Sequence, residues 1–303
     1  MSRIEKLAQE PYYVLGRYLR KNHPRIMSDE YYIKVVWKQC MGYELDLDNP
    51  KTFNEKLQWL KLHDRNPLYT TLVDKYEVKK WVAQRIGKEH VIPVLAVYDS
   101  VDEIDMDALP AQFVLKCNHD CGSIAICKDK ATFDLQSAKE KLGKALKKNY
   151  YWETREWPYK GVRPRIIAEE YKEDYSGELR DYKVYAFNGK CDYLMLCVGR
   201  SEGETKFLYY DRSWNMHKEL SYDGLNYGDS INVEKPVNLD SIFAFAQLLS
   251  DGIPFVRVDF YESFGELFFG EMTLYPSAGF GGNRTPDLDR YLNEQLVLND
   301  FNK

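Results

Sequence analysis

Arginine, aspartate and glutamate side chains interrupt two hydrophobic runs in FVRVDFYESFGELFFGEMTLYP, residues 255–276. The composition of this segment and its central Ser-Phe-Gly predict two strands that turn at Gly265. Residues equidistant from the turn would then face each other: Arg257 with Thr273, Asp259 with Glu271, and Tyr261 with Phe269. Side chains alternate between the faces of a strand, so all six are expected on one face. The opposite face is expected to be apolar, with Val256, Val258, Phe260, Met272 and Leu274.

The two carboxylates that face each other across this hairpin indicate a charged site. At a separation of roughly 5 Å, Asp259 and Glu271 repel each other unless a proton or a cation lies between them. A hard ion such as Mg²⁺ binds one or two carboxylates and completes its shell with phosphate and water oxygens. Arg257, on the same face, would add a donor fork for a phosphoryl oxygen. The alternative is a surface hairpin whose arginine bridges the two acids.

The segments that would position this hairpin mix helices with short antiparallel strands. NPKTFNEKLQWLKLHD and DKYEVKKWVAQRIG have helical patterns; Thr52 or Asn54 caps the first helix, and Gly87 ends the second. AQFVLKCNHDCGSIAICKD reads as strand, turn and strand, and DYKVYAFNGKCDYLMLCVG as a hairpin about an Asn-Gly turn. The order of these elements, with helices first and hairpins later, predicts an α+β or α/β protein of two or three lobes, without a regular doubly wound sheet.

Charge and cysteine content narrow the class of protein. The 303 residues carry a net charge of −5, which gives no basic field for nucleic acid. No apolar run is long enough to cross a bilayer and the N-terminus lacks a signal-peptide pattern, so we expect a cytoplasmic protein with reduced thiols. The CNHDC cluster lacks the paired spacing of a zinc site. YYVLGRYLRK predicts either a packed helix or a short amphipathic helix that contacts a membrane or a partner.

Several motifs resemble those of ATP-grasp enzymes. RVDFYESFGELFFGEMT resembles their metal-binding hairpin, with Asp259, Glu271 and Thr273 as ligands; most members have asparagine where this chain has Thr273. FVLKCNHDCGSIAI resembles the strand and small-residue loop that hold the phosphates. VDKYEVKKWV and IIAEEYK resemble the upstream lysine segment and the hinge strand that meets ribose and adenine. By this resemblance, the nucleotide-binding residues are Lys75, Lys116, Gly122, Ser123, Glu169 and Glu170.

Longer segments look like the TupA-like ATP-grasp family, among them NPKTFNEKLQWLKLHDRNPLYTTLVDKY and REWPYKGVRPRIIAEEY. This resemblance implies an ATP-grasp fold of the α+β class, with ATP held between two lobes together with one or two Mg²⁺ ions. The expected regions are a helical N-terminal region over 1–66, an N-terminal lobe over 67–168 and a C-terminal lobe over 169–303. The expected catalytic residues are Arg257, Arg180 and Lys183, and those of the substrate loop are Gly281, Asn283 and Arg284.

Such a protein would be a ligase that activates a carboxylate as an acylphosphate and joins it to an amine. Members are associated with capsule and other surface-polysaccharide gene clusters and are often labelled glycosyltransferases. The expected substrates are therefore an amino acid and a uronic acid or similar sugar carboxylate, free or lipid-linked; a lipid-linked acceptor would place the protein at the inner face of the membrane.

Three other functions remain open: an ATP-grasp kinase, a nucleotide-sugar glycosyltransferase, and a binding module without turnover. The Asp-x-Asp triplets at 46–48, 105–107 and 287–289 follow no convincing hydrophobic strand, which disfavours the glycosyltransferase. We interpret these acids as belonging to turns and to helix starts.

Overall fold

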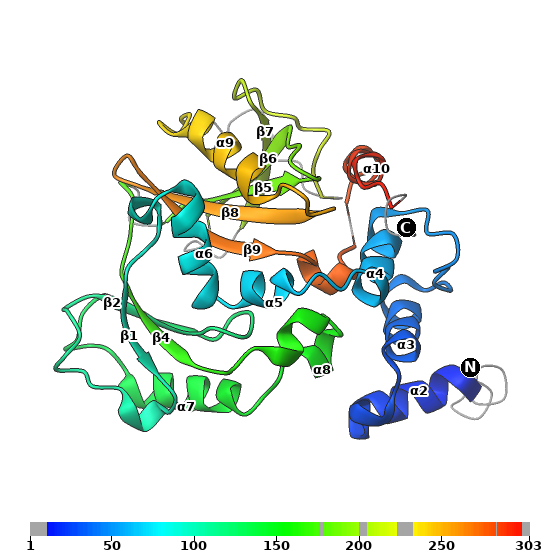
Figure 1. Ribbon diagram of the computed structural model, residues 1–303, viewed down its shortest axis with the longest axis horizontal. Coiled ribbons are helices and arrows are strands. Elements are labelled where there is room, and N and C mark those ends of the chain that lie inside the picture. Colours follow the sequence, from blue (N-terminus) through cyan, green and yellow to red (C-terminus); the bar gives the residue numbers. More distant parts are fainter. Residues whose placement is uncertain (1–10, 176–178, 200–204, 223–232, 283, 299–303) are drawn as a thin grey trace.

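Two antiparallel sheets and the surrounding helices make up the computed structural model, which describes residues 11–175, 179–199, 205–222, 233–282 and 284–298 (Figure 1). The smaller sheet has the strand order β1 (Val94–Tyr98), β4 (Ile166–Glu170), β2 (Phe113–Cys117), β3 (Ile124–Cys127). The larger has the order β7 (Lys206–Asp211), β6 (Tyr193–Val198), β5 (Asp181–Ala186), β8 (Val256–Ser263), β9 (Glu266–Thr273). These antiparallel pairings place the fold in the expected α+β class.

The smaller sheet has one face covered by a helix and an opposite face where Lys116 lies among apolar side chains. Phe113, Leu115 and Cys117 alternate along β2 and pack with helix α7 (Leu135–Leu146) in a buried cluster. The residues between them, among which is Lys116, point to the opposite face. The alternating apolar pattern of FVLKC therefore buries one side of the strand and leaves its lysine on the other.

The larger sheet is built in the same way. Its apolar face packs against α9 (Leu239–Leu249) and includes Val184, Val258 and Phe260, none of which is exposed to solvent. The other face presents Lys183 of β5 beside Asp259 of β8, because these two residues are direct partners in the strand register. The predicted separation of the hairpin into an apolar and a polar face is confirmed, except that Phe269, expected on the polar face, lies in the apolar core.

The hairpin turns where the sequence predicts, but its register contains a bulge. Phe264 and Gly265 both have positive φ (50° and 85°), as a two-residue turn that follows the strand twist requires. Beyond the Asp259–Glu271 pair the register shifts by one residue. Tyr261 consequently faces Phe268, so the predicted Tyr261–Phe269 pair is wrong.

Gly270 is the extra residue of this bulge. A Cβ atom on Gly270 would lie 2.8 Å from the Tyr261 ring and 3.1 Å from the Asp259 backbone oxygen, so only glycine fits without a shift. The bulge turns Phe269 to the apolar face, where its ring lies 6.4 Å from that of Phe260.

The remaining helices surround the two sheets. They are α2 (Pro11–Asn22), α3 (Asp29–Met41), α4 (Phe53–His63), α5 (Leu68–Val73), α6 (Glu77–Ile86), α8 (Tyr151–Thr154) and α10 (Pro286–Gln295). The 3₁₀ turns are η1 (Pro24–Ile26), η2 (Lys88–His90), η3 (Val101–Glu103), η4 (Trp157–Gly161) and η5 (Pro276–Gly279). In Figure 1, α5 and α6 lie between the sheets, and their apolar residues join the core of the larger sheet. Within the described ranges, no helix is long and apolar enough to cross a membrane.

The N-terminal region is helical, as expected. Thr52 caps α4 in a capping box, in which its hydroxyl accepts from the Glu55 N–H while the Glu55 carboxylate accepts from the Thr52 N–H. The expected lobe boundary between 168 and 169 falls inside β4, whose residues all pair within the smaller sheet. The three-part division remains a prediction.

Candidate active site

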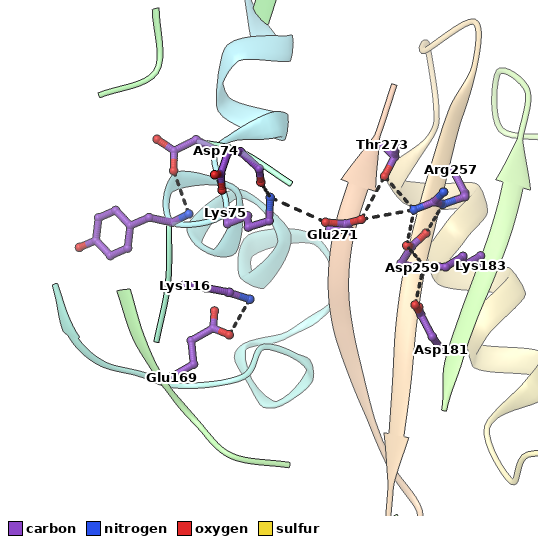
Figure 2. Close-up of polar contacts among 12 residues, drawn as sticks. Asp74, Lys75, Lys116, Glu169, Asp181, Lys183, Arg257, Asp259, Glu271 and Thr273 are labelled. Carbon is purple, nitrogen blue, oxygen red and sulfur yellow. Dashed lines mark hydrogen bonds and ion pairs between the residues drawn. The ribbon is translucent and has the colours of Figure 1, made fainter. Parts of the chain in front are cut away.

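Arg257 connects the two opposed acids of the hairpin (Figure 2). Its Nε donates to Asp259 Oδ1 at 2.7 Å, and its Nη2 donates to Asp259 Oδ2 at 2.6 Å and to Glu271 Oε1 at 3.3 Å. An arginine that bridges both acids is what the alternative interpretation of the hairpin describes. Asp259, however, is fully buried, so this is not a solvated surface.

Lys183 is the second cation on Asp259. Its ammonium donates to Asp259 Oδ2 and lies 2.5 Å from Asp181 Oδ2, two residues earlier on the same face of β5 (Figure 2). Burial acts to raise the pKa of Asp259, but Arg257 and Lys183 outweigh it and hold that pKa below the ordinary value. Lys183 was expected to be catalytic; its position makes it a partner of Asp259, and Asp181 is a member of the cluster that the sequence did not identify.

Glu271 is the open end of this cluster. Its side chain is 34% exposed, and its Oε2 lies 3.8 Å from the ammonium of Lys75. That ammonium also donates to the backbone oxygen of Asp120 at 2.5 Å, so Lys75 links the hairpin to the loop after β2 (Figure 2). The Thr273 hydroxyl donates to Glu271 Oε1 at 3.3 Å and accepts from Arg257 at 3.1 Å.

A cavity of about 340 Å³ lies beside the face of the smaller sheet that carries Lys116, and it holds a second charged group. Lys116 Nζ lies 2.6 Å from one oxygen of Glu169, and Lys79 Nζ lies 2.8 Å from the other. Glu170 also lines the cavity, and part of the cavity wall is apolar, formed by Ile92, Val114, Ile124, Ile126 and Phe269. Lys79 is a cavity residue that sequence reasoning missed, although its spacing of four residues after Lys75 was a signal.

Glu169 is therefore engaged by two ammonium groups. It is 3% exposed, and although burial acts to raise its pKa, Lys116 and Lys79 together hold it below the ordinary value. Glu170 is 44% exposed, and its carboxylate lies 3.4 Å from the Lys172 ammonium. Of the two acids expected to bind the nucleotide, Glu170 is therefore the more accessible.

The loop between β2 and β3 lies between the two charged groups. Gly122 has a φ of 91°, a left-handed conformation that glycine adopts without strain, and the Ser123 hydroxyl donates to the Asp120 carboxylate. The Lys75 N–H donates to the Asn118 oxygen, so this loop is tied to the segment before α6. The loop that carries Gly122 and Ser123 is thus tied to Lys75 through the backbone oxygens of Asn118 and Asp120.

Other predicted residues lie apart from this cluster. Arg180 precedes β5, and its Nε lies 3.4 Å from Asp174, so the structure does not bring it to Arg257. Arg284 and Gly281 lie together near α4: Arg284 Nη1 donates to Asn54 Oδ1 at 3.0 Å, and a Cβ on Gly281 would lie 3.1 Å from Arg284 Nη2. Asn283 lies outside the described residues.

The oxygen donors on the hairpin suit Mg²⁺ bound together with a phosphate. Among the described residues, no cation lies closer than 3.8 Å to Glu271 Oε2. By contrast, Asp259 Oδ1 accepts from Arg257, and Oδ2 accepts from both Arg257 and Lys183. Across the described part of the chain, no three acidic, histidine or cysteine side chains form a cage for a metal. An ion here would need phosphate and water oxygens for much of its shell, which is how Mg²⁺ is bound beside nucleotides.

This combination of a charged hairpin face, two sheets and a lysine-lined cavity defines the ATP-grasp class. The model of the TupA-like ATPgrasp family matches residues 55–297, and the chain belongs to that family. The predicted family and the ATP-grasp fold are thereby confirmed. A search of curated proteins finds no match.

Solved structures include similar ATP-grasp ligases at low identity. Ligase PsnB complexed with a minimal precursor is 10% identical, with a TM-score of 0.40 over 76% of this chain and 62% of its own. D-alanine–D-alanine ligase from Bacillus anthracis is 13% identical, with a TM-score of 0.38 over 74% and 65%. D-cycloserine synthetase DcsG is 14% identical, with a TM-score of 0.39 over 76% and 72%. The chain thus spans less than two thirds of the first two. PsnB has also been solved with Mg and ADP.

Proposed function

We propose that the protein is an ATP-dependent carboxylate–amine ligase that forms an amide bond through an acylphosphate. The observation that carries this proposal is the face of the β8–β9 hairpin, where Arg257 and Glu271 lie opposite Lys75, beside the cavity that contains Lys116. Phosphoryl transfer spreads negative charge over oxygens, so catalysis depends on cations that are already in position.

Each residue has a role in this proposal that follows from its position. Lys116 and Lys79, with Glu169 between them, hold phosphate oxygens at the mouth of the cavity, whose apolar wall suits a nucleobase. Lys75 and Arg257 approach Glu271 from two sides and stabilise the transferring phosphoryl group. Mg²⁺, held by Glu271 and phosphate oxygens, supplies further positive charge, with Asp259 and Thr273 as the remaining predicted ligands.

For the substrates, we propose an amino acid as the amine and a uronic acid or similar sugar carboxylate as the acceptor, in capsule or surface-polysaccharide synthesis. Family membership supports this proposal. The loop with Gly281 and Arg284 is the proposed acceptor side. A lipid-linked acceptor would place the protein at the inner face of the membrane, where α2, whose last turn carries Arg20 and Lys21, is the proposed contact.

The local structure disfavours a glycosyltransferase. In the triplet 46–48, the Asp46 carboxylate accepts from the N–H groups of Asp48 and Asn49, so it closes its own turn. Asp105 does the same for Asp107 and Ala108. These acids are used locally, as the sequence predicts for turns.

The test is to incubate the protein with ATP, Mg²⁺, glucuronic or galacturonic acid, and hydroxylamine. Hydroxylamine captures an acylphosphate as a stable hydroxamate, so a ligase releases ADP and forms hydroxamate together. Glu271→Gln should lower both rates by at least about 100-fold. Glu266→Gln, an exposed glutamate on the same strand, is the matched control and should leave them unchanged.

Other products would point to other functions. ADP release with a stable phosphorylated sugar and no hydroxamate identifies a kinase. Thermal stabilisation by UDP-sugars with Mn²⁺, but not by a Mg²⁺–ATP analogue, identifies a glycosyltransferase, since a ligand that binds the folded state raises its stability.

A further inference from the structure

Three polar side chains of α4 are buried although none has a role in the function proposed above. Asn54, Gln58 and Lys61 are spaced four and three residues apart, so they lie on one face of the helix. Gln58 and Lys61 are fully buried, and Asn54 is 5% exposed. Burying an amide or an ammonium is costly unless hydrogen bonds compensate for the lost water. The hydrogen-bond partners of these side chains therefore indicate what this face of α4 does.

The partners belong to one loop, residues 276–282, which begins with η5 after β9 and lies beside α4 (Figure 1). We call it the acceptor loop, because the proposed function places the acceptor there. Four hydrogen bonds run from α4 side chains to its carbonyl oxygens: Gln58 Nε2 to Gly279 at 2.7 Å and to Ala278 at 3.2 Å, Lys61 Nζ to Ala278 at 2.6 Å, and Asn54 Nδ2 to Gly281 at 2.5 Å. Lys61 also donates to the oxygen of Thr154 in α8 at 2.9 Å. One face of α4 thus holds the backbone of the acceptor loop.

The acceptor loop has a backbone conformation that needs such support. Ser277 and Ala278 are both left-handed, with φ of 51° and 52°, and Gly279 follows with φ of 68°. For residues other than glycine this conformation is unfavourable, and it persists only where the surrounding structure enforces it. Strained backbone of this kind is concentrated at functional sites. The hydrogen bonds from α4 to the Ala278 and Gly279 oxygens supply the enforcement.

Asn54 also connects the acceptor loop to Arg284, the cation on the proposed acceptor side. Arg284 Nη1 donates to Asn54 Oδ1 at 3.0 Å, while the nitrogen of the same amide donates to Gly281. The Arg284 guanidinium lies 5.3 Å from the ring of Phe53, the neighbouring residue of α4. The first turn of α4 therefore fixes this guanidinium relative to the loop backbone.

The α4 contacts also determine which backbone groups of the loop point away from the helix. In a trans peptide, the C=O and the following N–H point in opposite directions. The Ala278 oxygen points at α4, so the N–H of Gly279 points away from it. The same holds for the Gly281 oxygen and the N–H of Gly282. Because N–H groups attract an anion and carbonyl oxygens repel it, this arrangement favours a carboxylate on the side of the loop away from α4.

We infer that Asn54, Gln58 and Lys61 are positioning residues that hold the acceptor loop in the conformation that binds the carboxylate substrate, an inference that rests on the proposed ligase function. They act through the loop and do not touch the reacting atoms. None of them lines the cavity that contains Lys116, so their loss should weaken binding of the acceptor and not of ATP. The helical N-terminal region thereby contributes to the choice and affinity of the acceptor.

The experiment compares Gln58→Met with Lys56→Met. Gln58→Met keeps a side chain of similar length but removes the donor of two hydrogen bonds to the acceptor loop. Lys56 lies on the same helix and also donates to two backbone oxygens, those of Asn293 and Leu296 at the end of α10. Lys56→Met thus removes as many contacts from α4 without touching the acceptor loop, which makes it the matched control.

Hydroxamate formation is measured with hydroxylamine and Mg²⁺ while glucuronic acid and ATP are varied in turn. Gln58→Met should raise the KM for glucuronic acid by about tenfold or more and leave the KM for ATP within about twofold. Lys56→Met should leave both KM values within about twofold of the wild type. Asn54→Ala, which frees Gly281 and Arg284, should show the same selective rise and serves if Gln58→Met does not fold.

Three kinetic results would overturn the inference while leaving the ligase intact. They are an unchanged KM for glucuronic acid in the α4 variants, an equal rise in Lys56→Met, and a rise in the KM for ATP as large as that for the acid. Absence of hydroxamate with the wild-type protein would instead refute the proposed function.

Hydrogen exchange followed by mass spectrometry tests the positioning without substrates. Peptides that cover the acceptor loop should exchange faster in Gln58→Met than in the wild type and should be unchanged in Lys56→Met. Equal exchange of these peptides in all three proteins would overturn the inference, whatever the reaction catalysed.

Discussion

The Asp259→Asn substitution separates the structural from the catalytic role of the hairpin acids. Asp259 is fully buried and accepts hydrogen bonds from both Arg257 and Lys183. Breaking a buried ion pair by removing one partner costs about 3–5 kcal/mol. Each cation retains a second carboxylate, since Arg257 keeps Glu271 at 3.3 Å and Lys183 keeps Asp181 at 2.5 Å. We therefore expect the lower end, a loss of about 3 kcal/mol in the free energy of unfolding.

The loss of unfolding free energy in Asp259→Asn is to be compared with the loss in Glu271→Gln. Glu271 is 34% exposed and its ion pairs are longer, at 3.3 and 3.8 Å, so its loss should cost less than about 1 kcal/mol. Both variants should lose activity. Urea denaturation followed by tryptophan fluorescence at pH 7 measures both free energies. If the two variants unfold with the same free energy, Asp259 is not the anchor of Arg257 and Lys183, and our account of the cluster is wrong.

Further predictions concern the bulge, a helix cap and pH. Gly270→Ala should lower the free energy of unfolding by about 1–3 kcal/mol, because the added Cβ would lie 2.8 Å from the Tyr261 ring. Urea denaturation measures this change. An unchanged denaturation midpoint would contradict the bulge. Thr52→Ala should lower the free energy of unfolding by about 1 kcal/mol in the same assay, because α4 loses its cap. Thr71→Ala, on α5 and away from any cap, is the control. The pKa of Asp259 is lowered on folding, so its contribution to stability is present above the ordinary aspartate value, about pH 4, and is lost as pH falls through the folded value. Wild type and Asp259→Asn should consequently converge in stability below about pH 4, and a constant difference down to pH 2 would refute this linkage.

Local patterns in the sequence predicted the parts of the site that depend on neighbouring residues. The Asn188–Gly189 turn, the Thr52 cap and the Asp259–Glu271 pair each follow from short segments, because turn chemistry and strand alternation fix them. The bulge at Gly270 was not predictable in this way, since a one-residue shift between Phe269 and Glu271 leaves both strands equally hydrophobic.

The sequence patterns could not predict which distant segments of the chain pack together. Lys183 meets Asp259 because β5 pairs with β8, a contact across 76 residues. Lys79 reaches Glu169 only once α6 lies against the smaller sheet. The KFLYYD segment, which forms β7, was not singled out. Helix α10 was not delimited either, although Thr285 caps it, Pro286 begins it, and the acids at 287–289 lie in its first turn.

Binding of a non-hydrolysable ATP analogue is the most direct test of the central claim, that the hairpin face and the Lys116 cavity together hold Mg²⁺ and ATP. Isothermal titration calorimetry with AMPPNP should show binding to the wild type that tightens by about tenfold or more when Mg²⁺ is added, which corresponds to about 1.4 kcal/mol. Glu271→Gln should abolish that Mg²⁺-dependent gain, and Glu266→Gln should preserve it. No binding to the wild type, or an undiminished Mg²⁺ effect in Glu271→Gln, would contradict our account.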